Sequence, residues 1–312
     1  MKRFPSLSEG LAVHGVFWRQ CIDGVVLHVP SCFHPFLIWI STALFFVMAA
    51  SARRTVVQHL GVIRPGSWKL TNYARTFRVF QNFAWTLTDG AAHRLLKVPF
   101  TFEVEGPEFL DQLSTAKGAI VLTAHMGNYD LGAAIFVEKV QRPIRMVRAP
   151  EPDALTAKHL DRSIEQSASG GVKVDYNTQG ALLSFDLLNA LRSGDIISIQ
   201  GDRPMGEIAQ SPVTMFAHKA LLPSGPFVLA LAAQVPIFPL FVIRTGYRRY
   251  QFRFYEPIAC ARTGRARDED VAVAMQKWAD ILEGVIQVHW RQWHAFTPVF
   301  QASSRSKHAS TE

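Results

Sequence analysis

The sequence is poor in cysteine and in charge, and both shortages narrow the class of protein. Its three cysteines, Cys21, Cys32 and Cys260, form no close pair. They therefore predict neither a disulfide framework nor a zinc site, and they fit a reducing compartment. Only 19% of the 312 residues are charged while 48% are hydrophobic, against roughly 25% charged in an average globular chain. The chain can bury a large core and still expose apolar surface.

Long apolar runs are also scarce, which excludes a protein of many membrane spans, because each span needs ~20 apolar residues. The one candidate is the run 36–50, fifteen residues without a charge that end shortly before Arg53 and Arg54. Three interpretations stay open: a tilted span or re-entrant hairpin, a helix lying on the membrane surface, or a buried helix. A cleaved signal peptide is disfavoured, because the run starts late and no small-residue cleavage pattern lies nearby.

Several sequence motifs are missing as well. The chain has no G-x-S-x-G elbow, no P-loop, no G-x-G-x-x-G and no H-E-x-x-H, which disfavours a serine hydrolase, a nucleotidase, a dinucleotide enzyme and a zinc protease. The net charge of +8 favours anionic partners. Because the basic residues are scattered and form no dense stripe, they do not predict nucleic-acid binding.

From about residue 100 the pattern alternates between strands and helices. The runs 119–123 and 196–199 are continuously apolar, as parallel strands buried on both faces should be. We expect an α/β fold with a mixed, mainly parallel sheet flanked by helices, preceded by a helical membrane anchor. The predicted division is an anchoring segment at 1–55, a catalytic domain at 56–302 and a disordered tail at 303–312. Strands are predicted at 101–105, 119–123, 144–147, 172–174, 196–199, 235–243 and 250–255, and helices at 108–114, 129–139, 154–168, 181–192, 221–233 and 268–290.

Chemistry is expected where buried strands end, because ligands of such sheets bind beyond the carboxyl ends of the strands. His125 follows the run 119–123 and Asp130 lies five residues further on. Gly127 permits a turn, and Asn128 is a good N-cap for the next helix. If His125 lies in that turn, Asp130 can accept a hydrogen bond from one ring nitrogen and leave the other as a base. The alternative is a purely structural role, in which the histidine and the aspartate only cap the helix.

Charged side chains also follow the ends of two other predicted strands, and we call each such position a strand exit. Arg148 follows 144–147, and Asp202 with Arg203 follows 196–199. Arg203 can clamp a phosphate or a carboxylate, or else pair with Asp202 to hold the loop. The three exits together indicate a shared site more strongly than any one of them.

The stretch from His125 to Asp130 resembles the H-x4-D/E signature of the lysophospholipid acyltransferase superfamily. Its fuller form, His-x-Gly-Asn-x-Asp, resembles the branch that contains the lauroyl and myristoyl acyltransferases of lipid A biosynthesis. Further likeness comes from 201–204 (GDRP), 235–240 (VPIFPL) and 290–296 (WRQWHAF). The Arg-Pro after Asp202, and His289 beside the last stretch, depart from the branch pattern and leave the acceptor open.

The resemblance implies transfer of a fatty acyl chain from an acyl thioester, acyl-CoA or acyl-carrier protein, to a hydroxyl or amine of a lipid-like acceptor. His125 would be the general base, oriented by Asp130, with no acyl-enzyme, no metal and no cofactor. Substrate binding would fall to Asn128, Arg148, Asp202 and Arg203. The implied location is the bacterial inner membrane with the catalytic domain facing the cytoplasm, where acyl thioesters occur. A membrane-surface lipid hydrolase using the same His/Asp pair is the alternative, followed by a non-enzymatic binding protein.

Overall fold

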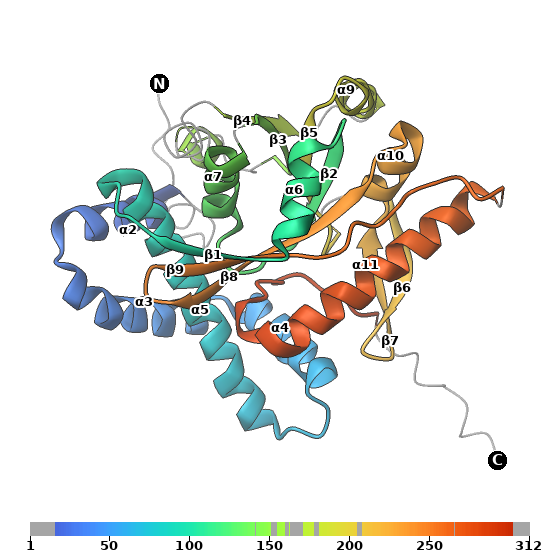
Figure 1. The fold of residues 1–312 in the computed structure, drawn as a ribbon. Coiled ribbons are helices and arrows are strands. Elements are labelled where there is room, and N and C mark those ends of the chain that lie inside the picture. Colours follow the sequence, from blue (N-terminus) through green and yellow to red (C-terminus); the bar gives the residue numbers. More distant parts are fainter. Residues whose placement is uncertain are drawn as a thin grey trace, which may run out of the picture.

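The computed structural model describes residues 16–140, 142–150, 155–159, 162, 171–177, 181–204, 208–264 and 266–301. Three predicted segments lie wholly or partly outside these residues: the tail at 303–312, most of the helix at 154–168, and the start of the anchoring segment. Both ends of the chain are marked in Figure 1.

The centre of the fold is a seven-stranded sheet in the order β1-β9-β8-β2-β5-β3-β4. Every neighbouring pair is parallel except β8 and β9, which are antiparallel. The predicted mixed, mainly parallel sheet is confirmed. Its strands are β1 (Thr101–Glu105), β2 (Ala119–Thr123), β3 (Ile144–Arg148), β4 (Val172–Tyr176), β5 (Ile196–Gln200), β8 (Ile237–Gly246) and β9 (Arg249–Phe254).

Helices cover both faces of this sheet (Figure 1). Residues of α6 (Pro107–Thr115) and α7 (Tyr129–Val140) share one buried cluster with the sheet, while α9 (Ala181–Arg192), α10 (Gly225–Ala233) and α11 (Arg267–His289) share the other. Alternate residues of β2 point into the two clusters, which explains why all five of its residues are buried. The continuous apolar runs in the sequence have this cause.

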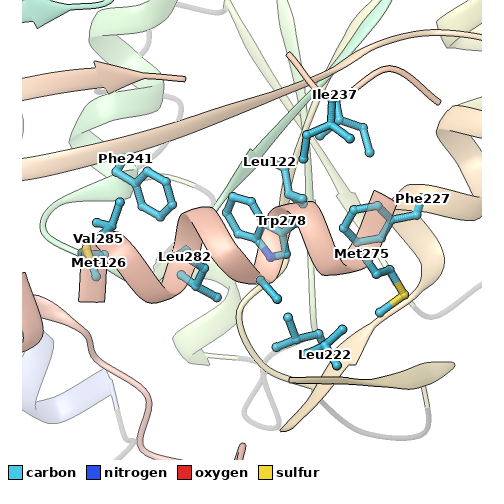
Figure 2. Packing of buried hydrophobic residues seen from close by; sticks show 14 of the residues in the cluster. Leu122, Met126, Leu222, Phe227, Ile237, Phe241, Met275, Trp278, Leu282 and Val285 are labelled. Atoms are coloured by element: carbon cyan, nitrogen blue, oxygen red, sulfur yellow. The ribbon is translucent and has the colours of Figure 1, made fainter. Parts of the chain in front are cut away.

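Trp278 on α11 is the largest fully buried side chain and fixes this helix to the sheet (Figure 2). Its ring stacks on Phe241 of β8 with the centroids 5.5 Å apart and the planes 5° from parallel. The indole Nε1 donates a hydrogen bond of 2.9 Å to the carbonyl oxygen of Gly201. The core thus holds the loop that follows β5.

Among the described residues, four α-helices precede the sheet: α2 (Val16–His28), α3 (His34–Met48), α4 (Ala50–Ile63) and α5 (Lys69–Leu96). The predicted apolar run forms α3, and the segment Ser31–Met48 is long and apolar enough to cross a membrane. One side of α3 packs on α5, with Phe46 of α3 edge-on to Phe80 of α5 at 5.6 Å. Asp89 joins α5 to the sheet by accepting hydrogen bonds from Tyr250 Oη (2.6 Å) and Arg244 Nε (3.2 Å).

The prediction of a helix over 221–233 was wrong in its first residues. The chain there forms an antiparallel hairpin of β6 (Gln210–Met215) and β7 (His218–Pro223), and the helix begins only at Gly225. The hairpin turn uses Phe216 and Ala217 with φ of 51° and 59°. Because neither is a Gly, Asn or Asp, the usual turn signal is absent from the sequence.

Candidate active site

His125 lies in a tight turn between the end of β2 and the start of α7, as predicted. Gly127 makes the turn possible with a φ of +54°. A Cβ atom at this position would lie 1.7 Å from the carbonyl oxygen of Val242. Both the left-handed backbone and the close approach of β8 therefore require glycine.

The C-terminal segment and α5 hold this turn in place. The backbone N–H of His294 donates to the carbonyl oxygen of His125 (2.7 Å), and the N–H of Gly127 donates to that of Gln292 (3.1 Å). From α5, the Thr86 hydroxyl donates to the carbonyl oxygen of Gly127 at 3.1 Å. The turn that carries the His125 ring is thus held by contacts from two separate parts of the chain.

Asp202, not Asp130, is the carboxylate at the His125 ring. Its Oδ1 lies 2.7 Å from His125 Nδ1, and its Oδ2 accepts a hydrogen bond of 2.9 Å from Trp293 Nε1. The Asp202 residue is 0% exposed. With Nδ1–H donated to Asp202, the Nε2 atom is left as the basic position of the imidazole.

The orienting role predicted for Asp130 is therefore corrected. The Asp130 carboxylate is 41% exposed and pairs with Arg148 NH1 at 3.1 Å. The physical reason is topological: β5 is the parallel neighbour of β2, with Thr123 beside Gln200, so the loop after β5 reaches Nδ1. A spacing along one segment cannot reveal which strand lies alongside it.

Electrostatics favour an ionised Asp202 beside a neutral His125. Burial alone would raise the pKa of Asp202, but the His125 ring, Arg203 and the Trp293 indole outweigh it and bring the pKa to about 2. Burial lowers the pKa of His125, and Asp202 opposes this only in part. At neutral pH the ring can therefore accept a proton, as a general base must.

Arg148 and Arg203 lie around the His125 ring, so the predicted convergence of strand exits is confirmed. Arg203 Nε is 3.3 Å from His125 Nδ1. The charges of both arginines lower the pKa of His125, after the effect of burial. Since the Nδ1 proton is used by Asp202, the guanidinium of Arg203 acts as a neighbouring positive charge that opposes ring protonation.

Asn128 occupies the predicted N-cap position. Its Oδ1 accepts a hydrogen bond from the backbone N–H of Leu131 (3.2 Å), and its Nδ2 donates to the carbonyl oxygen of Thr86 (3.1 Å). The residue is 2% exposed. One polar group of the side chain caps α7 and the other joins the turn to α5, so its geometry supports a positioning role. The predicted contact with substrate stays a prediction.

Two small hollows of about 20 Å³ each lie at the carboxyl edge of the sheet beside α7. The first is lined by Thr123, Arg148 and Gln200 among others. The second shares Thr123, Tyr129 and Ser198 with it, and its walls are mainly apolar. The Tyr129 ring lies edge-on to His125, with centroids 5.5 Å apart. The apolar walls are formed by Val121, Ala133, Phe136, Ile144, Leu240 and Val242.

Two residues that hold the site in place were not predicted from the strand exits. Trp293 binds the second oxygen of Asp202, and Thr86 holds Gly127 from a helix some 40 residues earlier. The stretch containing Trp293 was noticed only through its family resemblance. Thr86 carries no signal of its own, because one threonine on an amphipathic helix is an ordinary residue.

The fold is thus an α/β sheet with a buried His/Asp pair at its carboxyl edge, beside a small hollow with mainly apolar walls, an arrangement suited to an enzyme that uses general-base chemistry. Residues 70–302 match the model of the bacterial lipid A biosynthesis acyltransferase family. This match covers most of the chain, and the protein belongs to that family. No curated protein matches the chain.

Proposed function

We propose that the protein transfers a fatty acyl chain from an acyl thioester to a hydroxyl or amine of a lipid-like acceptor at the membrane. The observation that carries this proposal is the His125–Asp202 pair, 2.7 Å apart and buried at the carboxyl edge of the sheet. Membership of an acyltransferase family supports the reaction class.

In the proposed reaction, His125 Nε2 takes the proton from the acceptor hydroxyl or amine as its oxygen or nitrogen attacks the thioester carbonyl carbon. The new acyl bond forms and the carbon–sulfur bond breaks. The departing thiolate then recovers the proton from the imidazolium. Asp202 holds the ring and stabilises its positive charge, so that base assistance contributes typically ~10²–10⁴-fold in rate.

The substrate roles follow from charge and polarity. Arg148 and Arg203 are cations beside His125, and we propose that they bind a phosphate or carboxylate of the acceptor. The phosphate of acyl-CoA or acyl-carrier protein lies at the far end of the pantetheine arm from the thioester, so it is not the group that these arginines contact. We propose that the acyl chain binds along the apolar walls under α7, where the hollow of about 20 Å³ must widen to admit it. Each methylene buried there contributes about 0.8 kcal/mol.

We propose that α3 attaches the protein by lying in the membrane surface. Its 15 residues give a length of roughly 23 Å at 1.5 Å per residue, and the whole 18-residue segment Ser31–Met48 gives roughly 27 Å, so a span across the ~30 Å of hydrocarbon would use every residue of the segment. His34, Ile38 and Thr42 face the protein and are buried. Trp39, Ile40 and Val47 are 44–71% exposed. A helix that packs on α5 with one face and is apolar on the other suits an interfacial position.

We also propose that the site faces the cytoplasm at the bacterial inner membrane, since acyl thioesters are made in the cytoplasm.

The test uses purified full-length protein in detergent micelles containing a total bacterial lipid extract. Acyl-carrier protein or CoA carrying a ¹⁴C-labelled fatty acyl group is added in separate reactions. We expect label in a lipid product with at least one donor, and its loss in His125→Ala. Label appearing only as free fatty acid would instead establish the alternative, a membrane-surface lipid hydrolase. Transfer undiminished in His125→Ala would contradict both.

A further inference from the structure

His294 is a buried histidine whose ring has no hydrogen-bond partner among the residues that the structure describes. It is 2% exposed, and both Nδ1 and Nε2 are buried and unpaired. Its ring lies among aromatic side chains, with Phe83 of α5 edge-on at 5.2 Å. Burying a polar group without a partner is unfavourable, so a ring left in this state calls for an explanation.

A nearby histidine shows what full pairing looks like in this protein. His59 is 4% exposed, and its Nε2 accepts a hydrogen bond from the backbone N–H of Val299 at 3.2 Å. The backbone of Ala295 also bonds the His59 ring, which stacks on Trp293 at 5.1 Å. The His59 ring thus holds the C-terminal segment by hydrogen bonds, whereas the ring nitrogens of His294 bond none of the residues that the structure describes.

His294 lies next to the proposed base. Its backbone N–H donates to the carbonyl oxygen of His125 at 2.7 Å, and the adjoining residues Met126 and Trp293 form an antiparallel bridge. The charges of Arg203 and Asp202 both act on the His294 ring. Because His125 is itself only 7% exposed, an acceptor that reaches it must displace the side chains over both rings.

The chemistry of the His294 ring limits what it can bind. Burial, reinforced by the positive charge of Arg203, lowers its pKa to about 3, so the ring is neutral and is a poor partner for a phosphate. A neutral imidazole offers one N–H donor and one nitrogen acceptor. Its match is a group that both donates and accepts, such as a hydroxyl or an amide.

We propose that His294 is a substrate-binding residue that hydrogen-bonds a neutral hydroxyl or amide of the acceptor, beside the nucleophile that His125 deprotonates. This inference rests on the proposed acyl transfer. It narrows the acceptor to molecules that carry a second uncharged polar group next to the acylated position.

The test compares His294→Phe and His294→Gln with the wild-type protein in the same labelled-donor assay, with the lipid extract titrated as the acceptor source. For His294→Phe we expect the apparent KM for the extract to rise about tenfold, the equivalent of one neutral hydrogen bond, with the KM for the donor unchanged. Glutamine, which keeps a donor and an acceptor, should recover part of this loss. An unchanged KM for the extract in both variants would overturn the inference.

The melting temperature gives an independent readout. Removing two unpaired buried nitrogens should leave the melting temperature of His294→Phe equal to or above that of the wild type. The control, His59→Phe, breaks paired contacts and should melt at a lower temperature. An equal fall in both variants would make His294 a structural residue and overturn the inference. Absence of transfer in the wild type would instead refute the proposed function itself.

Discussion

At the scale of single residues, the site depends on which carboxylate reaches the His125 ring. Asp202 is held by two hydrogen bonds that it accepts, one from His125 Nδ1 and one from Trp293 Nε1. Asp130 is partly exposed and bound to Arg148. The two aspartates differ in burial and in partner, which makes them a matched pair for mutation.

We expect Asp202→Asn to lower kcat by roughly 10²–10⁴-fold, because an amide in place of the carboxylate favours the wrong tautomer of the base. Asp130→Asn should lower kcat by less than about tenfold, since it removes only a partly exposed ion pair with Arg148. Circular dichroism of both variants controls for folding. A larger loss from Asp130→Asn than from Asp202→Asn would contradict the assignment.

Buried neutral histidines also predict how stability depends on pH. Burial lowers the pKa of His59 to about 4, from 6.5 in the unfolded chain. Between these values the unfolded state binds more protons than the folded state, so stability is full above pH 6.5 and is lost as the pH falls towards 4. One such group contributes a slope of at most about 1.4 kcal/mol per pH unit.

Urea unfolding at pH 7 and pH 5 measures this slope. His59→Gln removes the titrating ring and keeps a donor and an acceptor for Ala295 and Val299, so its stability should depend less on pH than that of the wild type. An equally steep dependence in His59→Gln would show that His59 is not a source of the slope.

At the scale of elements, the turn between β2 and α7 is the part most sensitive to substitution. Gly127→Ala would place a Cβ atom against the Val242 carbonyl oxygen, 1.7 Å away, in a backbone with φ +54°. Gly66→Ala meets a similar φ of +78° but nothing within 4 Å. The control therefore isolates the cost of the contact from the cost of the backbone conformation.

We expect Gly66→Ala to cost about 1–2 kcal/mol for the left-handed conformation alone. Gly127→Ala should cost roughly 3 kcal/mol or more and abolish transfer, because relieving the contact moves His125. Chemical unfolding and the acyl transfer assay measure the two effects. Equal losses of stability, with activity kept in Gly127→Ala, would contradict this account of the turn.

Much of the element pattern could be predicted from the sequence, because short apolar runs and the helices between them have distinct periods. The strands of the sheet and the helix at 181–192 were found in this way. The β6–β7 hairpin was missed, since its turn lacks the usual residues. The convergence of His125, Arg148 and Arg203 followed from strand exits, whereas the pairing of His125 with Asp202 needed the strand order, which no local pattern contains.

At the scale of the whole molecule, the exposed apolar face of α3 and the net charge of +8 both favour attachment to an anionic membrane. We expect Trp39→Glu combined with Val47→Glu to lower binding to vesicles of phosphatidylethanolamine and phosphatidylglycerol by about tenfold or more. Val288→Glu, on α11 and 66% exposed, is the control and should bind as the wild type does. Flotation of the vesicles measures binding, and equal binding of all three proteins would contradict attachment through α3.

The central claim is that His125 is the base for acyl transfer to a lipid. The most direct measurement is mass spectrometry of lipid extracts from cells that express the wild type or His125→Ala at equal levels, with cells lacking the protein as reference. The account predicts a lipid heavier by one acyl group in wild-type cells alone. The same acylated lipid in His125→Ala cells, or identical lipids in all three, would contradict it.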